Sequence, residues 1–485
     1  MKFSARRVRL AVLALAAAAA FAGTAHSARA AAPSVRLLAS SDQVTLYRYR
    51  RRVLLNLGVW VAPVGGDLQI RVQRPDYDSP LAADQIDATT GDVVRSIPDE
   101  ALGWRGLRRF FHVTFTNGIG ELVGQKDVRF CPNGSFRQRV DDSGPDTSPY
   151  PYVCSGSPFM KGMVWGISDG WATSAFGGDE YDYRRPTIRL PAGHYTATVE
   201  VSPGYADLFD VAPGDAEVTL DVDVWDVSGG GVKPALQPAD SPDLALAAAP
   251  LVPDTTSPDP STLPDLVALP AWSIRMRHWS GRDYLTFAAT EWNAGPRRLN
   301  VEGFRRPGTD VMDAYQYFED ETGTVVARAS AGTFEWDPRP RHYHWHFEQF
   351  AAYSLLDADS NEVVRSHKQG FCIFPTDPLD LAAEGAEWIP WNFGRFSVCG
   401  SRDSIWVRET LAAGWGDTYY QSVPGQSFNV TRLPTGWYWV SVRVNPQGLL
   451  YETSTANNEE RRLVYIHGRR GHKRVIVAPW HGITQ

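Results

Sequence analysis

The chain has 485 residues, with 42 glycines, 34 prolines, 17 tryptophans and a net charge of −7. Glycine and proline make up roughly 16% of the residues against an average of about 12%, which argues against a helical bundle or a coiled coil. The 43% hydrophobic content excludes global disorder, and the negative charge argues against unspecific nucleic-acid binding. This length allows two or three domains, and aromatic, turn-rich segments favour β-sandwiches or barrels.

Residues 1–30 have the three parts of a secretory signal peptide. A basic stretch ends at Arg9, an apolar run extends from about Leu10 to Ala22, and Ala28-Arg29-Ala30 fits the cleavage rule. The apolar run is short for a membrane span, with an uncleaved anchor as the alternative, and Arg6-Arg7 hints at a twin-arginine route. We expect a secreted, extracellular protein without a membrane segment after signal removal. Loss of the five basic residues in the signal leaves a net charge of −12.

The four cysteines fall into two sequence-local pairs, Cys131 with Cys154 and Cys372 with Cys399. In an oxidising compartment each pair is expected to close one loop. Each closure stabilises the fold by roughly 3–4 kcal/mol in the loop-entropy model. Free thiols are the alternative.

A proline-rich segment separates two blocks of the chain. The segment begins with Ser228-Gly229-Gly230-Gly231, and eight prolines follow up to Pro264. Apolar residues show no helical or strand-like periodicity there. This composition is typical of an extended, semi-rigid linker. We expect a linker over 228–262, an N-terminal β domain over 33–227 and a C-terminal domain over 263–485.

Both blocks contain strand-like alternation of apolar and polar residues, as in 194–201 and 437–444. Leu-Pro-x-Gly precedes each of these segments, and Ser-Pro or Asn-Pro follows. We expect an all-β fold of two β-sandwich-like domains. The matching flanks suggest a duplication, with chance recurrence of Pro-Gly turns as the alternative. Eight of the 11 histidines lie in the C-terminal block, which places the chemistry there and predicts a non-catalytic N-terminal domain.

The segment 342–346, with the sequence His-Tyr-His-Trp-His, is the sharpest chemical feature. Alternate side chains of a strand share a face, so His342, His344 and His346 are expected to point one way and Tyr343 and Trp345 the other. The outer two Cα atoms are roughly 13 Å apart on a straight strand, and two imidazoles just reach a common ion across that span. Three neutral nitrogens suit Cu(II) or Zn(II). A histidine-rich β surface without metal is the alternative.

A hairpin is expected after the histidines. The run 347–357 ends in the turn-like Ala358-Asp359-Ser360-Asn361, and Val363-Val364 begins a return strand that leads to Lys368. The hairpin is expected to bring Lys368 back toward the histidine strand. Whether Lys368 shares the histidine face depends on the parity of the register, which is open at this point.

These segments resemble the copper amine oxidases of the lysyl oxidase family. Residues 342–346 are similar to the family's H-x-H-x-H copper motif, and the run from Glu348 to Asp357 nearly matches E-x-F-x-x-Y-x-L-L-D, with Glu348 one place early. Residues 367–372 resemble the segment that holds the family's cofactor lysine, and 416–419 the segment that holds its cofactor tyrosine. Pro264-Asp-Leu-Val267 resembles the start of the catalytic domain, so the resemblance spans about 263–467 and leaves out the N-terminal block.

The resemblance implies copper on the three histidines and a lysine tyrosylquinone made from Lys368 and Tyr419, with Tyr420 as the alternative partner. Formation of this cofactor needs the neutral amine of Lys368, which burial or a nearby cation favours by lowering the lysine pKa. A carboxylate near a cationic imine accepts a proton, so Asp417 is the predicted catalytic base. A turn-capping aspartate is the alternative.

Some members of the family carry a structural calcium near the domain start and the last long strand. Oxygen ligands suit calcium, and Ser454 stands where the family has an acid, which lowers the charge of the site. The matching positions are Asp265, Leu266 by its carbonyl, Glu452, Asn457 and Asn458.

The resemblance implies a secreted copper amine oxidase that converts primary amines, or the lysine side chains of a peptide or protein, to aldehydes. O₂ is then the oxidant, and ammonia and hydrogen peroxide are released. The acidic balance suits lysine-bearing or polyamine substrates, and no nucleic-acid partner is expected. One alternative is a three-histidine zinc hydrolase, which gives Lys368 and Tyr419 no role. A second is a non-enzymatic copper-binding or adhesion β-sandwich.

Overall fold

The computed structural model describes most of the chain from residue 32 to residue 484. The predicted signal peptide, residues 227–251 within and beside the predicted linker, and His342 lie outside the described residues. The described ranges are 32–154, 156–177, 186–226, 252–306, 309–338, 344–366, 368, 370–390, 399–402, 404–422 and 426–484.

Strands dominate the described ranges and build six sheets, three from residues 34–226 and three from residues 266–477. The expected all-β fold is therefore confirmed. The paired strands run antiparallel apart from β15 and β2, which run parallel. None of the helices in the described part of the chain is long and apolar enough to span a bilayer. These helices are η1 (Asp99–Ala101), α1 (Pro203–Leu208) and η2 (Pro260–Thr262).

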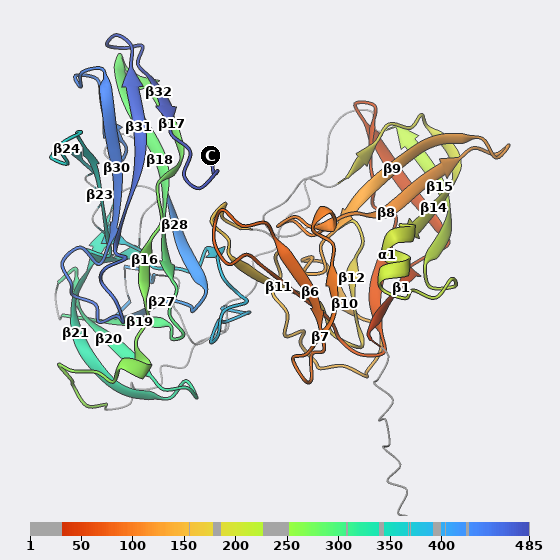
Figure 1. The fold of residues 1–485 in the computed structure, drawn as a ribbon, viewed down its shortest axis with the longest axis horizontal. Coiled ribbons are helices and arrows are strands. Elements are labelled where there is room, and N and C mark those ends of the chain that lie inside the picture. Colours follow the sequence, from red (N-terminus) through yellow and green to blue (C-terminus); the bar gives the residue numbers. More distant parts are fainter. Residues whose placement is uncertain are drawn as a thin grey trace, which may run out of the picture.

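The N-terminal half, residues 32–226, holds two four-stranded sheets and one seven-stranded sheet (Figure 1). The first sheet is, in spatial order, β1 (Ser34–Ala39), β4 (Val59–Val64), β12 (Trp171–Ser174) and β10 (Arg137–Arg139). The second is β11 (Gly162–Ile167), β5 (Leu68–Gln73), β6 (Ala82–Ile86) and β7 (Val93–Ile97). The third is β13 (Thr187–Ile188), β3 (Arg52–Leu54), β2 (Gln43–Tyr49), β15 (Glu217–Asp226), β14 (Gly193–Val201), β8 (Leu107–Thr116) and β9 (Leu122–Phe130).

The C-terminal half, residues 252–484, holds the other three sheets. One contains β16 (Leu266–Ala268), β18 (Arg282–Asn293), β28 (Trp415–Gln421) and β26 (Asp377–Pro378), with β17 (Trp272–Trp279) and β29 (Phe428–Asn429) also paired to β18. The next is β25 (Gly370–Phe371), β22 (His344–Glu348), β21 (Val325–Asp337), β20 (Val311–Glu319), β19 (Leu299–Arg305) and β27 (Trp406–Leu411). The last is β24 (Glu362–Arg365), β23 (Ala351–Leu356), β30 (Gly436–Val444), β31 (Glu459–His467) and β32 (Arg474–Val477).

The two segments with similar flanks are both strands, β14 and β30, as the alternation predicted. Each begins at the glycine of Leu-Pro-x-Gly and carries a tyrosine two residues later. The Tyr195 hydroxyl donates to the Pro191 carbonyl at 3.1 Å, and the Tyr438 hydroxyl donates to the Pro434 carbonyl at 3.0 Å. A tyrosine that ties a strand to the preceding corner in this way is a known device of β-sandwiches. The halves therefore share a local structure, and a common origin by duplication stays a prediction.

The expected hairpin after the histidines is present and positions Lys368. Gln349, with a φ of 65°, directly follows the end of β22, and the chain continues into β23 of a different sheet. β24 returns antiparallel to β23, with Leu355 opposite Val364. The chain then crosses back, and Phe371 of β25 pairs with Phe347 of β22. Lys368 thus lies directly before a strand that is bonded to the histidine strand, as predicted.

Both predicted disulfides are present, Cys131–Cys154 and Cys372–Cys399. The second bridge also lies close to a carboxyl oxygen of Glu409, with its sulfurs and that oxygen within 4.8 Å of one another. Sulfurs joined in a disulfide offer no thiolate, so this cluster is a structural feature and not a metal site.

The two halves of the molecule contact each other through the segment that follows β26. The Lys161 backbone N–H donates to the Leu379 carbonyl at 2.6 Å, and the Leu381 N–H donates to the Gly162 carbonyl at 2.9 Å. His481 pairs with Asp78 at 2.7 Å on the same side. Because β26 itself pairs with β28, the N-terminal half supports a strand next to the one that carries Tyr419.

The end of the predicted linker, residues 252–262, is ordered on the C-terminal half. Arg328 of β21 donates its backbone N–H to the Pro253 carbonyl at 3.0 Å and accepts from the Thr255 N–H at 2.8 Å. Its guanidinium bonds the Asp254 carboxylate at 2.7 Å. Proline-rich composition therefore coexists here with fixed contacts, because the backbone of β21 supplies hydrogen-bond partners for Pro253 and Thr255.

Candidate active site

The two described histidines of the motif lie on β22 and share a face. Their Nε2 atoms are 2.9 Å apart. Trp345 between them is fully buried on the other face and donates its indole N–H to the Ser401 carbonyl at 2.8 Å. The alternation predicted for this strand is confirmed at His344, Trp345 and His346.

The spacing of these two nitrogens suits a shared metal ion. Two metal–imidazole bonds of about 2.0–2.1 Å that meet near a right angle place their nitrogens about 2.9 Å apart. His346 is only 4% exposed and His344 is half-buried, so the pair converges at the edge of the core. Neutral imidazole nitrogens are ligands that copper and zinc accept.

A carboxylate that the sequence analysis did not single out lies behind this pair. Asp337 Oδ2 of β21 is 3.4 Å from His346 Nδ1, and both side chains are buried. A carboxylate on the far nitrogen of a metal-binding histidine fixes the ring orientation and raises its basicity. Asp337 could have been identified only from the pairing of β21 with β22, because that pairing places Asp337 opposite His344.

Lys368 is buried between two aromatic rings. Its Nζ atom is 4.8 Å from the ring centroid of Phe371 and 5.2 Å from that of Tyr419, and the residue is 9% exposed. Tyr420, the alternative partner, is 60% exposed and its ring packs against Trp272. The structure therefore brings Lys368 together with Tyr419 and directs Tyr420 to the other face of β28.

The hydroxyl of Tyr419 lies between two acceptors. It donates to the carboxylate of Asp417 and is 2.7 Å from the carbonyl oxygen of Cys372. Burial, followed by repulsion from the Asp417 carboxylate, raises the pKa of Tyr419 well above its ordinary value. Burial also raises the pKa of Asp417 to about 8, although hydrogen bonds from Tyr419 and from the Phe374 backbone N–H oppose the shift. A carboxyl group with a pKa near neutrality is suited to take up and release protons.

Two further carboxyl groups lie in the core around Asp417, and the sequence analysis missed both. Glu291 stands opposite Asp417 on β18 and accepts from the Tyr353 hydroxyl at 3.1 Å. Glu409 accepts from the Ile373 backbone N–H at 2.7 Å. Burial, together with the charge of Asp417, raises the pKa of both groups well above the ordinary value. The available signal was an acidic residue on the apolar face of its strand. Glu409 shares its face with Val407 and Leu411, and Glu291 follows Phe287 and Ala289 on its face.

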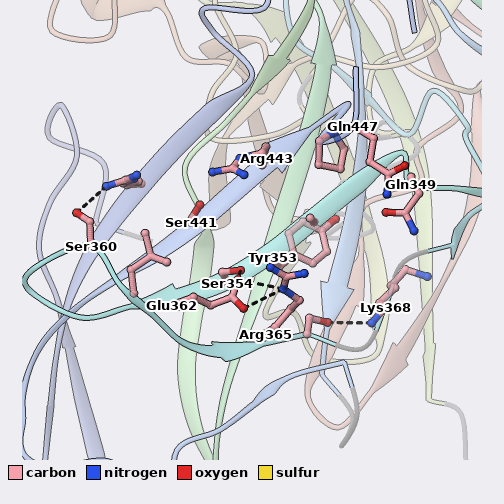
Figure 2. Close-up of a pocket in the computed structure, with 15 residues that line it drawn as sticks. Gln349, Tyr353, Ser354, Ser360, Glu362, Arg365, Lys368, Ser441, Arg443 and Gln447 are labelled. Carbon is pink, nitrogen blue, oxygen red and sulfur yellow. Dashed lines mark hydrogen bonds and ion pairs between the residues drawn. The ribbon is translucent and has the colours of Figure 1, made fainter. Parts of the chain in front are cut away.

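A polar pocket of about 330 Å³ leads from the surface to Lys368. Figure 2 shows Lys368 and Ser360 at opposite ends of the pocket. Its walls carry the three arginines 365, 443 and 461 against one acid, Glu362. Glu459 pairs with two of these arginines. The net negative charge of the whole chain is therefore not found in the lining of this pocket.

A second cluster of oxygen atoms forms where Asp265 meets the loop before β31. Asn457 donates to Asp265 Oδ2 at 3.1 Å, while Asn458 and the Leu266 backbone N–H donate to the Glu452 carboxylate at 2.7 and 3.1 Å. The Oδ1 atoms of Asp265, Asn457 and Asn458 are buried and have no hydrogen-bond partner among the described residues. Buried acceptors without partners are costly, and oxygen donors of this kind fit a calcium ion.

Comparisons with a family model and with curated proteins agree on one family for part of the C-terminal half. Residues 315–474 match the model of the lysyl oxidase family. Lysyl oxidase homolog 1 of Homo sapiens is 30% identical over 138 residues, which are 28% of this chain and 21% of that protein. Protein-lysine 6-oxidase of Gallus gallus is 28% identical over 28% of this chain and 29% of its own length, and the enzyme of Sus scrofa is 28% identical over 49% of its length.

The chain thus spans between about a fifth and a half of the length of these curated relatives. The family match begins within β20 and ends within β32, so it covers the histidine motif, Lys368 and Tyr419 and leaves out Asp265 and Leu266. The resemblance read from short motifs is confirmed over residues 315–474, including the strands between the motifs. Residues 315–474 of this chain are a lysyl oxidase family domain.

Proposed function

We propose that the C-terminal half is a copper-dependent amine oxidase that converts a primary amine to an aldehyde, ammonia and hydrogen peroxide. The observation that carries this proposal is the burial of Lys368 with its Nζ atom 5.2 Å from the Tyr419 ring centroid, inside a lysyl oxidase family domain. His344 and His346, with His342, would hold the copper. When bound, copper and a quinone built from Lys368 and Tyr419 supply the redox chemistry with O₂ and the electrophile for amines.

The residues around Tyr419 have defined roles in this proposal. Asp417 orients the Tyr419 hydroxyl and, with a pKa of about 8, holds or releases a proton at Oδ2 near neutral pH. Phe371 packs edge-on against Tyr419 with ring centroids 4.8 Å apart, which excludes water from one side of the ring. The polar pocket gives a substrate amine a route to Lys368.

The test of this function is quinone formation after copper loading. We expect visible absorbance, reaction with phenylhydrazine, and peroxide release with at least one member of a panel of primary amines and lysine peptides, all absent in copper-depleted protein. A colourless protein that does not react with phenylhydrazine contradicts the proposal. Hydrolysis by zinc-loaded protein would instead support the zinc hydrolase, which leaves the Lys368–Tyr419 pair without a role.

The copper site gives a prediction that does not depend on turnover. His346→Ala removes the buried nitrogen that faces His344, so copper affinity is expected to fall at least about a hundredfold. His194→Ala, at an exposed histidine that pairs with Asp223 in the N-terminal half, is the matched control. Competition titration with a coloured copper chelator measures both variants. Equal copper affinity in the two variants would show that the metal is held elsewhere.

The cluster around Asp265 predicts stabilisation by calcium. Millimolar calcium is expected to raise the melting temperature of the wild-type protein by several degrees, because an ion that binds only the folded state stabilises it. Asp265→Asn should lose this increase, whereas Asp142→Asn at an exposed loop position should keep it. A melting temperature of the wild-type protein that does not respond to calcium would show that this cluster does not bind calcium.

Export is the remaining part of the proposed function. Two disulfides suit an oxidising compartment, and we propose that the protein is secreted after residues 1–30 are removed. The N-terminal half, which contacts the segment after β26, would act as a non-catalytic support of the catalytic half. N-terminal sequencing of the exported protein tests the cleavage after Ala30.

A further inference from the structure

A basic pocket lies at one end of the C-terminal half, where three turns meet. We call it the arginine pocket; its volume is about 380 Å³ and its lining is Arg282, Asn429, Thr431, Arg432 and Arg470. Arg282 begins β18 after a tight turn, Arg432 follows β29, and Arg470 lies in the turn between β31 and β32. None of these residues lines the pocket that leads to Lys368.

The three arginines of the pocket have no acidic partner in its lining. None of the three guanidinium groups makes a hydrogen bond, an ion pair or a ring contact with any residue that the structure describes. Three cations without partners around one pocket repel one another, and a chain with a net charge of −7 has no general surplus of positive charge. The arrangement therefore points to an anionic ligand.

A buried carboxylate fixes the three turns in place. Asp283 is 0% exposed and accepts from the backbone N–H groups of Gly471 at 2.6 Å and Lys473 at 3.2 Å. Its own N–H donates to the Thr431 hydroxyl at 2.9 Å. The positions of the three arginine Cα atoms are therefore set before any ligand arrives, and preorganised donors bind with a smaller loss of entropy.

The surroundings favour a large anion over a single small one. Arg277, Arg469 and Arg474 are exposed on the same turns and strand ends, and they extend the positive surface beyond the pocket. Trp279, beside them, is 57% exposed. The pocket volume suits a group the size of a sugar ring, not a lone oxyanion. Guanidinium groups form paired hydrogen bonds with the oxygens of phosphate and sulfate esters.

We propose that the arginine pocket binds the sulfate or phosphate esters of a polyanion and anchors the protein to it. The proposal does not rest on the oxidase function, because the two pockets share no residue. It predicts attachment of an otherwise acidic protein to an anionic polymer through one face. Sulfate and phosphate share the chemistry that the arginines recognise, so the experiment has one arm for each.

Fluorescence anisotropy tests the proposal with labelled heparin fragments as the sulfate arm and labelled linear polyphosphate as the phosphate arm. The test variant carries Arg282→Gln, Arg432→Gln and Arg470→Gln. The matched control carries Arg50→Gln, Arg51→Gln and Arg52→Gln, which removes three charges from adjacent exposed arginines of the N-terminal half. Melting temperatures show that both variants are folded.

The wild-type protein and the control are expected to bind at least one probe, and the tighter probe identifies the ester. The pocket variant should bind at least about thirtyfold more weakly, because each lost hydrogen bond to a charged group weakens binding by about tenfold. In a plot of log affinity against log salt concentration, the slope for the pocket variant should be shallower than that of the wild-type protein by about two to three. Absence of binding to both probes, or equal weakening in the pocket variant and the control, would overturn the proposal.

Discussion

Replacement of Lys368 by arginine is expected to abolish quinone absorbance and to lower amine oxidation at least about a thousandfold. Arginine keeps a cation over the Phe371 and Tyr419 rings, which are 4.8 and 5.2 Å from the lysine Nζ atom, so the packing of the site is retained. Its guanidinium group does not lose a proton in proteins and therefore cannot supply the neutral amine that joins the Tyr419 ring. The loss is chemical and not structural.

The control for this variant is Lys126→Arg, at an exposed lysine of the N-terminal half. Both variants should match the wild-type protein in copper content and melting temperature, because neither change touches the histidine pair. Peroxide release and phenylhydrazine reactivity then separate them. Substantial turnover in Lys368→Arg would show that amine oxidation by this protein does not use Lys368.

The second large effect is expected from Asp417→Asn. Asparagine has the shape of aspartate and still accepts from the Phe374 backbone N–H, but it does not take up a proton. Turnover should fall by about a hundredfold to ten-thousandfold, the range for loss of a general acid or base. Asp359→Asn, at an exposed turn position, should leave turnover unchanged and serves as the control.

The Asp417→Asn variant is also expected to be more stable than the wild-type protein at alkaline pH. Burial raises the pKa of Asp417 to about 8 in the folded protein, against about 3.9 in the unfolded chain. The folded state therefore binds this proton more tightly, and the contribution of Asp417 to stability is lost as the pH rises from about 4 to about 8. Copper-free Asp417→Asn should melt several degrees above copper-free wild type at about pH 9 and should lose that advantage at about pH 4.

Thermal melts at both pH values, with Asp359→Asn alongside, measure this difference. Glu291 and Glu409 also have raised pKa values because of their burial, so the stability of the Asp417→Asn variant is expected to keep part of the wild-type pH dependence. An asparagine variant that is less stable than wild type at alkaline pH would show that Asp417 is ionised and well solvated in the fold.

The strand period predicted part of the site directly. Because side chains alternate along a strand, the shared face of His344 and His346 and the burial of Trp345 follow from spacing alone. The position of Lys368 could not be obtained in the same way. It depends on the break at Gln349 and on the pairing of Phe371 with Phe347, and both are properties of the assembled sheets.

The buried acids show why the rest of the site escaped prediction. Glu291 and Asp417 are 126 positions apart in the chain and meet only because β18 and β28 pair in one register. Glu409 reaches the site from another sheet. The oxygen cluster at Asp265 was predicted from the family resemblance and not from spacing. The three unpaired oxygens there give that prediction a physical basis.

The most direct test of a cofactor built from Lys368 and Tyr419 is mass spectrometry of the copper-loaded protein after proteolysis. We expect one cross-linked product that joins the peptide of Lys368 to the peptide of Tyr419, with one oxygen gained and four hydrogens lost relative to the two peptides. The product should be absent from copper-depleted protein and from Lys368→Arg. Unmodified peptides of both residues at full yield in copper-loaded protein, or a cross-link to Tyr420 instead, would contradict the proposed cofactor.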